Sequence, residues 1–282
     1  MYVHRAILTR CLPEEKKDEL TDAIAGLVCN VPTSVLVTER ILPLPRRLQR
    51  LLIDKYCAPH IQAEARAEPA NRDCLMRVYL GSTRGTTGRQ RFFSLRNFKL
   101  HLNHMAALQL DVRALARGMG IAYALMHWAA ETDGRGVEFV LGSSSQAVSL
   151  AKDAGKLPML RPLSYTGPWS GRHVDIFRHV EATKLWLLDF HQARTIPING
   201  GGVEMAVEAA LNNDPYIPKP LRQSPHEKEA WKAFALSYLE AANVILEGEV
   251  DEICELPLRF IKGLVKDERE RRLLRPEPEV EL

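Results

Sequence analysis

Three acidic residues stand where carboxylates often carry out chemistry. Asp133 follows a long helical pattern and precedes two glycines, and Glu138 lies within the apolar run 137–141 that comes next. A second apolar run of the same kind ends in Asp189. Loop and strand ends of this type commonly form sites in α/β and α+β proteins. The sequence therefore predicts that the three acids converge in one pocket, where they would transfer protons or hold a cation.

Each acid also has a structural interpretation. Asp133 could cap the tight turn that follows it. A carboxylate such as Glu138 inside an apolar strand is costly to bury unless it is paired, and a salt bridge to Arg135 or Arg194 would satisfy it. Asp189 has the same alternative.

Two further groups lie close to these acids in the sequence. His191 follows Asp189 by two positions and is a candidate for proton transfer. Three serines, 143–145, follow the strand at Glu138, and one of them could accept an acyl group. No histidine spacing marks a catalytic triad.

The loop at 81–91 combines glycines, hydroxyl side chains and arginines, and Phe92 and Phe93 follow it. Backbone N–H groups and guanidinium groups in such a loop can bind phosphate, although a flexible, solvated loop has the same composition. The basic residues of this stretch are Arg84, Arg89, Arg91, Arg96 and Lys99.

Helical and strand patterns surround these groups. Helices are predicted for residues 13–28, 46–56, 101–108, 112–130, 203–211, 227–246 and 258–274. Strands are predicted for residues 33–42, 75–80, 137–141 and 185–190. Asp111 is a suitable N-cap. Residues 60–73 are polar and irregular, 143–181 form a long insertion, and 275–282 form a charged tail expected to be disordered.

The composition is that of an ordinary globular protein. The 282 residues are 46% hydrophobic and 26% charged, with a formal net charge of +3, which permits a nucleic-acid partner without requiring one. The five cysteines form no Cys-x-x-Cys pair; Cys57, His60 and Cys74 come nearest to a zinc ligand set. Without a signal peptide or a membrane-length apolar run, we expect a cytoplasmic protein with reduced thiols.

The order of these motifs resembles the catalytic half of the protein-kinase and aminoglycoside-phosphotransferase fold. This resemblance implies that Asp133 is the catalytic-loop acid, that Glu138 replaces the metal-binding Asn, and that Asp189, followed by Phe190, takes the metal-site position. ATP phosphotransfer also needs a glycine-rich lid and a strand lysine, and neither precedes Ser34. Kinase activity is therefore disfavoured.

The same resemblance implies a truncated kinase-like α+β fold in one domain, 1–274. Its small N-terminal lobe would span 1–45, with a helix over 1–8 as a remnant, and its mainly helical C-terminal lobe would span 46–274.

A second resemblance covers most of the chain between residues 35 and 216. The chain is similar to a fungal family of unknown function, loosely labelled zinc-finger-like, which includes the arginine-containing cyclodipeptide synthases. The pieces that carry the likeness are Thr38-Glu-Arg-Ile, Leu51-Leu-Ile-Asp-Lys-Tyr-Cys57, Phe93-Ser-Leu-Arg-Asn-Phe98, Met126-His-Trp128, Val137-Glu-Phe-Val-Leu-Gly142 and Leu185-Trp-Leu-Leu-Asp-Phe190. The essential acidic motif of those synthases, an Asp followed shortly by Val-Glu, corresponds to Asp133 and to Val137-Glu138.

The resemblance implies a tRNA-dependent aminoacyltransferase of secondary metabolism that joins arginyl-tRNA and a second aminoacyl-tRNA into a cyclic dipeptide. Glu138 would be the base, and Asp133 or Asp189, with His191, would bind the substrate, while the basic residues 84–99 would bind tRNA. Aminoacyl-tRNAs are the expected partners, with no DNA, membrane, cofactor or metal. Two alternatives stay open: a small-molecule phosphotransferase with Mg²⁺ at Asp133 and Asp189, and an inactive kinase-like interaction module.

Overall fold

The computed structural model describes residues 2–3, 6–9, 35–38, 41–86, 93–143 and 183–274. The chain divides into two compact units, one formed by Val3–Ile41 and one formed by Met1–Tyr2 with Leu42–Leu282. The predicted helix over 13–28, most of the insertion over 143–181 and the tail lie outside the described residues.

The smaller unit contains an antiparallel strand pair. β2 (Ala6–Thr9) pairs with β3 (Val35–Thr38), from Ala6 opposite Thr38 to Thr9 opposite Val35. The strand predicted over 33–42 is confirmed in its central part. The helix predicted over 1–8 is wrong, because this stretch contains β1 (Tyr2–Val3) and β2. Pairing with β3 satisfies backbone hydrogen-bonding groups of β2, whereas an isolated helix of eight residues has only marginal stability.

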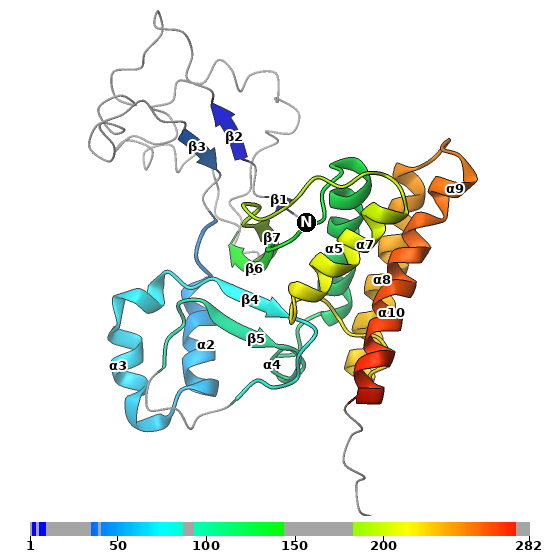
Figure 1. The fold of residues 1–282 in the computed structure, drawn as a ribbon. Coiled ribbons are helices and arrows are strands. Elements are labelled where there is room, and N and C mark those ends of the chain that lie inside the picture. The colour runs from blue at the N-terminus through cyan, green and yellow to red at the C-terminus, as the bar shows by residue number, and fades with distance from the viewer. Residues whose placement is uncertain are drawn as a thin grey trace, which may run out of the picture. The chain divides into compact units, whose positions relative to one another are not determined.

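The larger unit is built on a five-stranded sheet in the order β1-β7-β6-β4-β5 (Figure 1). Its longer strands are β4 (Met76–Tyr79), β5 (Phe98–His101), β6 (Glu138–Ser143) and β7 (Thr183–Leu188). β6 is antiparallel to β4 and to β7, and β4 is parallel to β5. Three of these strands confirm sequence predictions. The fourth, β5, was not predicted because its aromatic and basic residues continue the composition of the preceding loop and because it runs directly into a helix.

Helices make up most of the rest of this unit. They are α2 (Arg46–Tyr56), α3 (Gln62–Ala67), α4 (Leu102–Ala107), α5 (Val112–Ala124), α7 (Gly200–Asn212), α8 (Pro225–Ile245), α9 (Asp251–Cys254) and α10 (Leu256–Leu274), with 3-10 turns at Pro59–Ile61 and Pro69–Arg72 and a π-helical turn at Leu125–Ala129. Asp111 caps α5 as predicted, since its carboxylate accepts a 2.9 Å hydrogen bond from the Ala114 N–H. The irregular structure predicted for 60–73 is wrong, because α3 and the two 3-10 turns occupy it.

The core lies where α5 packs against α8, with α7 and α10 alongside (Figure 1). Gly120 of α5 permits this approach, because a Cβ there would collide with the Phe234 carbonyl oxygen and the Ser237 hydroxyl of α8. The Tyr238 hydroxyl accepts a 2.9 Å hydrogen bond from the Trp128 indole and lies 3.0 Å from Nδ1 of His127. Burial lowers the pKa of His127 to about 3, so this ring is a neutral core residue. These contacts fix the end of the π-helical turn, where the loop to Asp133 begins.

The protein is thus of the mixed α+β class. None of the helices in the described part of the chain combines the length and hydrophobicity that crossing a membrane requires.

Candidate functional site

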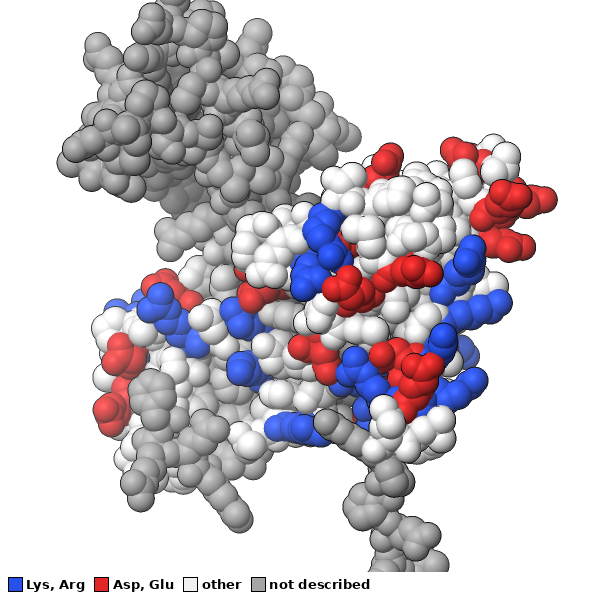
Figure 2. Space-filling model, in the orientation of Figure 1, with Lys and Arg blue, Asp and Glu red and all other residues white. Residues whose placement is uncertain are grey.

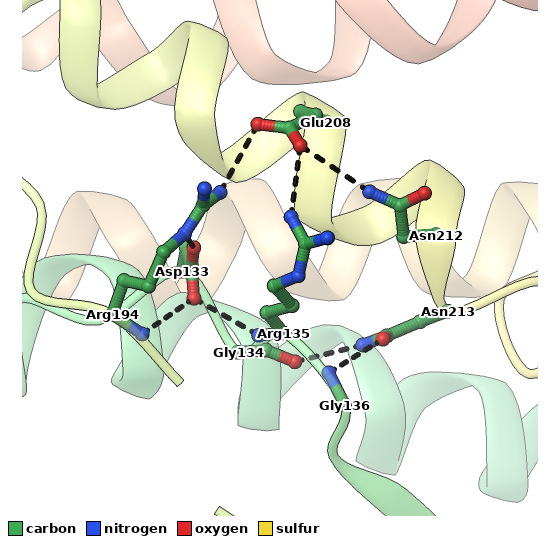
Figure 3. A network of polar contacts seen from close by, with 8 residues as sticks. All are labelled: Asp133, Gly134, Arg135, Gly136, Arg194, Glu208, Asn212 and Asn213. Atoms are coloured by element: carbon green, nitrogen blue, oxygen red, sulfur yellow. Dashed lines mark hydrogen bonds and ion pairs between the residues drawn. The ribbon is translucent and has the colours of Figure 1, made fainter. Parts of the chain in front are cut away.

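Asp133 lies at the centre of a buried polar network (Figure 3). Its side chain is fully buried. One carboxylate oxygen accepts hydrogen bonds from the backbone N–H groups of Arg135 (3.0 Å) and Arg194 (2.9 Å). The other accepts a 2.6 Å bond from Nε of Arg194. Both oxygens are therefore occupied by protein donors.

Charge and further contacts stabilise this arrangement. Burial by itself raises the pKa of Asp133, but the hydrogen bonds from Arg194 and Arg135 outweigh burial and hold this pKa below its ordinary value. Glu208 of α7 pairs with both arginines, at 2.8 Å from Arg135 and 3.1 Å from Arg194. Asn213 holds the same turn, because its side chain bonds to Gly134 O (2.7 Å) and Gly136 N (2.8 Å). Asp133 thus fastens the loop before β6 to the segment after β7.

Glu138, the first residue of β6, has a different environment. Its side chain is 19% exposed and pairs with the Arg77 guanidinium of β4 at 2.8 Å. Burial raises the pKa of Glu138; Arg77 and the Tyr216 hydroxyl oppose this rise, and the Asp189 carboxylate adds to it. The net pKa lies above the ordinary value for a glutamate. A partly exposed carboxylate of this kind is suited to act as a base.

Asp189 lies next to Glu138 through the pairing of β6 and β7. Glu138 is opposite Leu188 in the register, and Asp189 follows at the strand end with a positive φ of 68°. Its carboxylate contacts Nδ1 of His191, and both side chains are substantially exposed. The structure therefore places Asp189 near enough to Glu138 for its charge to act on the Glu138 carboxylate, and His191 contacts Asp189.

Glu138 shares one face of the sheet with basic side chains of β4 and β5. In the register, Arg77 is opposite Lys99 of β5 and Val140 of β6, and side chains of paired residues point to the same face. Glu138 is two residues from Val140 and so shares this face. Tyr79 is likewise paired with His101. Lys99, Arg77 and Glu138 therefore form a row across three adjacent strands.

A cleft of about 280 Å³ lies at the edge strand β5. It shares Lys99 with this face of the sheet, whereas Phe98, the neighbour of Lys99 on the strand, points to the opposite face. Aromatic and basic side chains that line this aromatic cleft are Tyr56, Phe93, Phe98, His104, Arg84 and Lys99. The ring centroids of Phe98 and His104 are 5.8 Å apart in a stacked arrangement. Burial lowers the pKa of His104, which favours its neutral form near pH 7. The aromatic cleft thus contains aromatic rings on which a planar ligand could stack and two basic side chains, Arg84 and Lys99.

The predicted tRNA-binding residues are only partly placed together. Arg84 and Lys99 line the aromatic cleft, and Arg96 is exposed on the segment between Phe93 and β5. Arg89 and Arg91 lie outside the described residues.

The structure brings two of the three predicted acids together. The Asp189 carboxylate adds to the rise in the pKa of Glu138, whereas Asp133 is enclosed by its own arginines and its carboxylate is closed to a ligand. The salt bridge suggested between Glu138 and Arg135 or Arg194 is wrong, because those arginines pair with Glu208 and Asp133. Sequence reasoning missed Arg77 and Tyr216. Arg77 is the one charged residue in the predicted strand 75–80, a signal that could have identified it.

No zinc site is built from the described side chains. Within the described ranges, no three His, Cys, Asp or Glu residues lie where they could hold a metal ion. Burial raises the pKa of Cys74 to about 12, which opposes the thiolate form that zinc binds.

Comparison with known proteins gives one partial match. The model of the DUF3669 family, described as a zinc finger protein, matches residues 185–250. This segment includes Asp189 and contains two histidines, His191 and His226, but no cysteine, so it lacks the thiolate ligands of the usual zinc-finger sites. Neither the curated proteins nor the solved structures give a significant match.

Proposed function

We propose that this protein is a tRNA-dependent cyclodipeptide synthase that condenses arginyl-tRNA with a second aminoacyl-tRNA. The observation that carries the proposal is the row across one face of the sheet, in which Glu138, a carboxylate of raised pKa, pairs with Arg77, and Arg77 lies opposite Lys99, a lining residue of the aromatic cleft. The row combines a base with a surface suited to an RNA end, as the resemblance described above leads us to expect.

The reaction requires a base but no energy source, because an aminoacyl-tRNA ester is already activated. The α-amine of one aminoacyl group attacks the ester carbonyl of the other. The tRNA whose ester is attacked leaves, and its ribose oxygen takes up the proton that the amine loses. The remaining amine then attacks the second ester, closes the ring and releases the second tRNA. An α-amino group has a pKa of about 7.7–8.0, so a positioned carboxylate can accept its proton in the transition state.

Glu138 would be this base. Arg77 holds the carboxylate in one orientation, and burial raises its pKa, which makes it a stronger base. Asp189, whose carboxylate is partly exposed beside His191, would bind the guanidinium of the arginyl substrate, since planar guanidinium groups pair well with carboxylates. Asp133 would position the loop that carries Glu138.

The aromatic cleft would bind the single-stranded acceptor end of the tRNA. Bases stack on aromatic side chains, each such contact being worth about 1–3 kcal/mol, and basic side chains track the backbone. Phe93, Phe98, Arg84 and Lys99 supply both kinds of contact. The cleft shares Lys99 with the row that leads to Glu138, so the esterified end would lie near the base.

A truncated kinase-like architecture is part of this proposal. α5, the loop at Asp133, the antiparallel strands β6 and β7, and the Asp189-Phe190 pair follow one another in the order of a kinase catalytic half. Phosphotransfer is not favoured, because both Asp133 oxygens accept hydrogen bonds from Arg135 and Arg194 and so are poorly placed to bind Mg²⁺.

The proposal is tested by incubating the purified protein with arginyl-tRNA and each of the other aminoacyl-tRNAs, followed by mass spectrometry. We expect an arginine-containing cyclic dipeptide whose formation is abolished by ribonuclease. Glu138→Gln should lower its rate by about 10²–10⁴-fold, while the control Glu204→Gln, at an exposed glutamate of α7, should not. The absence of product with every second amino acid would refute the proposal.

A further inference from the structure

A second cleft lies along the N-terminal half of α2. This α2 cleft has a volume of about 500 Å³ and lies between α2, α3 and the 3-10 turn Pro69–Arg72. Its charged lining residues are Arg46, Arg50, Arg66, Arg72, Asp54 and Glu68. They leave a net charge of +2, and no predicted site includes them.

Three of the four arginines pair with no acid in the part of the chain that the structure describes. Arg66 pairs with Asp54, and Glu68 accepts a hydrogen bond from the Ala70 N–H. Among the described residues, no acid pairs with Arg46, Arg50 or Arg72. Three guanidinium groups therefore line one concavity without an ion pair to a described acid, and Glu68 offsets only one of their three charges.

This arrangement is unfavourable for the protein alone. Arg46 and Arg50 are four residues apart on one helix face, where like charges repel. They also lie in the first turns of α2, which contain no acid, and the helix dipole disfavours cations at that end. Over α7 and α10, by contrast, Figure 2 shows acidic and basic side chains interspersed on the face that it draws. An external anion would supply the counter-charge that the α2 cleft lacks.

The α2 cleft and the aromatic cleft are both lined by residues of α2. Tyr56, at the end of α2, lines the aromatic cleft, whereas Ile53, one turn earlier, lines the α2 cleft. Asn71 of the α2 cleft accepts a 2.6 Å hydrogen bond from Leu95 N–H, next to Ser94 of the aromatic cleft. α2 has 11 residues and so extends roughly 16 Å, a length that several nucleotides of one strand cover. The ligand that fits both clefts is therefore an extended polyanion.

We propose that the α2 cleft binds backbone phosphates of the tRNA whose acceptor end occupies the aromatic cleft. Arg46, Arg50 and Arg72 donate to phosphate oxygens, as guanidinium groups commonly do. This contact rests on the proposed function for the identity of the RNA, and it makes tRNA affinity depend on residues remote from Glu138.

The test measures the binding of a fluorescently labelled acceptor-stem RNA that has a single-stranded 3′ end and carries no amino acid. Binding is followed by fluorescence anisotropy at several salt concentrations. Each of the substitutions Arg46→Ala, Arg50→Ala and Arg72→Ala should weaken binding about fivefold, as for an exposed ion pair. Each should also reduce the slope of log K against log salt by about 0.7–0.9. Arg47→Ala is the matched control, because Arg47 is exposed on the same helix and does not line the cleft.

Loss of affinity must be separated from loss of folding. Removing Arg46 or Arg50 relieves repulsion, so the thermal midpoint should stay the same or rise. A triple variant that binds RNA as tightly as wild type, or no more weakly than Arg47→Ala, would overturn the proposal. So would arginine-dependent binding of pyrophosphate with no change in RNA affinity.

The same variants distinguish this inference from the proposed synthase activity. Arginine-dependent RNA binding without any cyclic dipeptide would support the α2 cleft and refute the synthase. Product formation with an unchanged dependence on tRNA concentration in the triple variant would refute the α2 cleft alone.

Discussion

Replacing Asp133 by asparagine tests whether this carboxylate holds the loop together. The side chain is fully buried and accepts three hydrogen bonds, two from Arg194 and one from Arg135. A hydrogen bond to a charged group contributes about 1.5–3 kcal/mol. An asparagine keeps one acceptor but turns an NH₂ donor toward an N–H donor. We expect Asp133→Asn to lower the free energy of unfolding by about 3 kcal/mol, the lower end of the range for breaking a buried pair.

Urea denaturation followed by tryptophan fluorescence measures this change, and it corresponds to a fall of roughly 6–12 °C in Tm. The pKa of Asp133 is held below its ordinary value, so its contribution is present above about pH 4 and is lost as the pH falls through the folded-state pKa. The difference between wild type and variant should therefore shrink below pH 4. Asp267→Asn, in an exposed i,i+4 pair with Arg271, is the control and should cost about 0.5 kcal/mol or less.

An unchanged unfolding free energy for Asp133→Asn would refute this reasoning. If the same variant remained fully folded and lost synthase activity, the loss would be assigned to a misplaced Glu138, because Asp133 holds the loop that carries this residue.

Three further predictions concern the base and the core. Arg77→Met removes the cation that opposes the rise in the pKa of Glu138, so the acid limb of the pH–rate profile for cyclic dipeptide formation should move to higher pH; an unmoved limb would exclude Glu138 as the titrating base. Tyr216→Phe should shift the limb in the same direction, because the Tyr216 hydroxyl also lowers this pKa; a shift to lower pH in the same profile would contradict the assignment. Gly120→Ala should destabilise the protein by about 1–3 kcal/mol in urea denaturation through overpacking against α8. Its control, Gly118→Ala, meets only the flexible Leu185 side chain at 3.2 Å and should be neutral or stabilising; equal losses would contradict the packing account.

The spacing of apolar residues predicted the longer helices and strands, which bury one side against the core. α2 was predicted with its observed bounds because its leucines recur at helical spacing between a proline break and a polar turn. Strands β4, β6 and β7 were predicted because their apolar runs are bounded by loop residues. The short helix α3 was missed, since six residues give too few repeats for a period to emerge, and β5 was missed because its aromatic and basic residues continue the composition of the preceding loop.

The partners in the site depended on register, which local patterns do not specify. The structural interpretation of Glu138 paired it with Arg135 or Arg194, but β6 lies beside β4, and this pairing brings Arg77 to the same face. The burial of Asp133 depends on Arg194, 61 residues later, which returns to the loop only after β7. Convergence of Glu138 and Asp189 was predictable because each stands at an end of a strand.

The left-handed backbone at Asp189 restricts what this position can be. A backbone φ of 68°, as at Asp189, is tolerated by Gly, Asn and Asp but is strained for most other residues. An alanine scan would therefore confound loss of the carboxylate with a distorted chain reversal after β7. Asparagine preserves the main-chain conformation and removes only the charge, so it is the informative replacement. The same restriction predicts that natural variation at this site is confined to a few small polar residues or glycine.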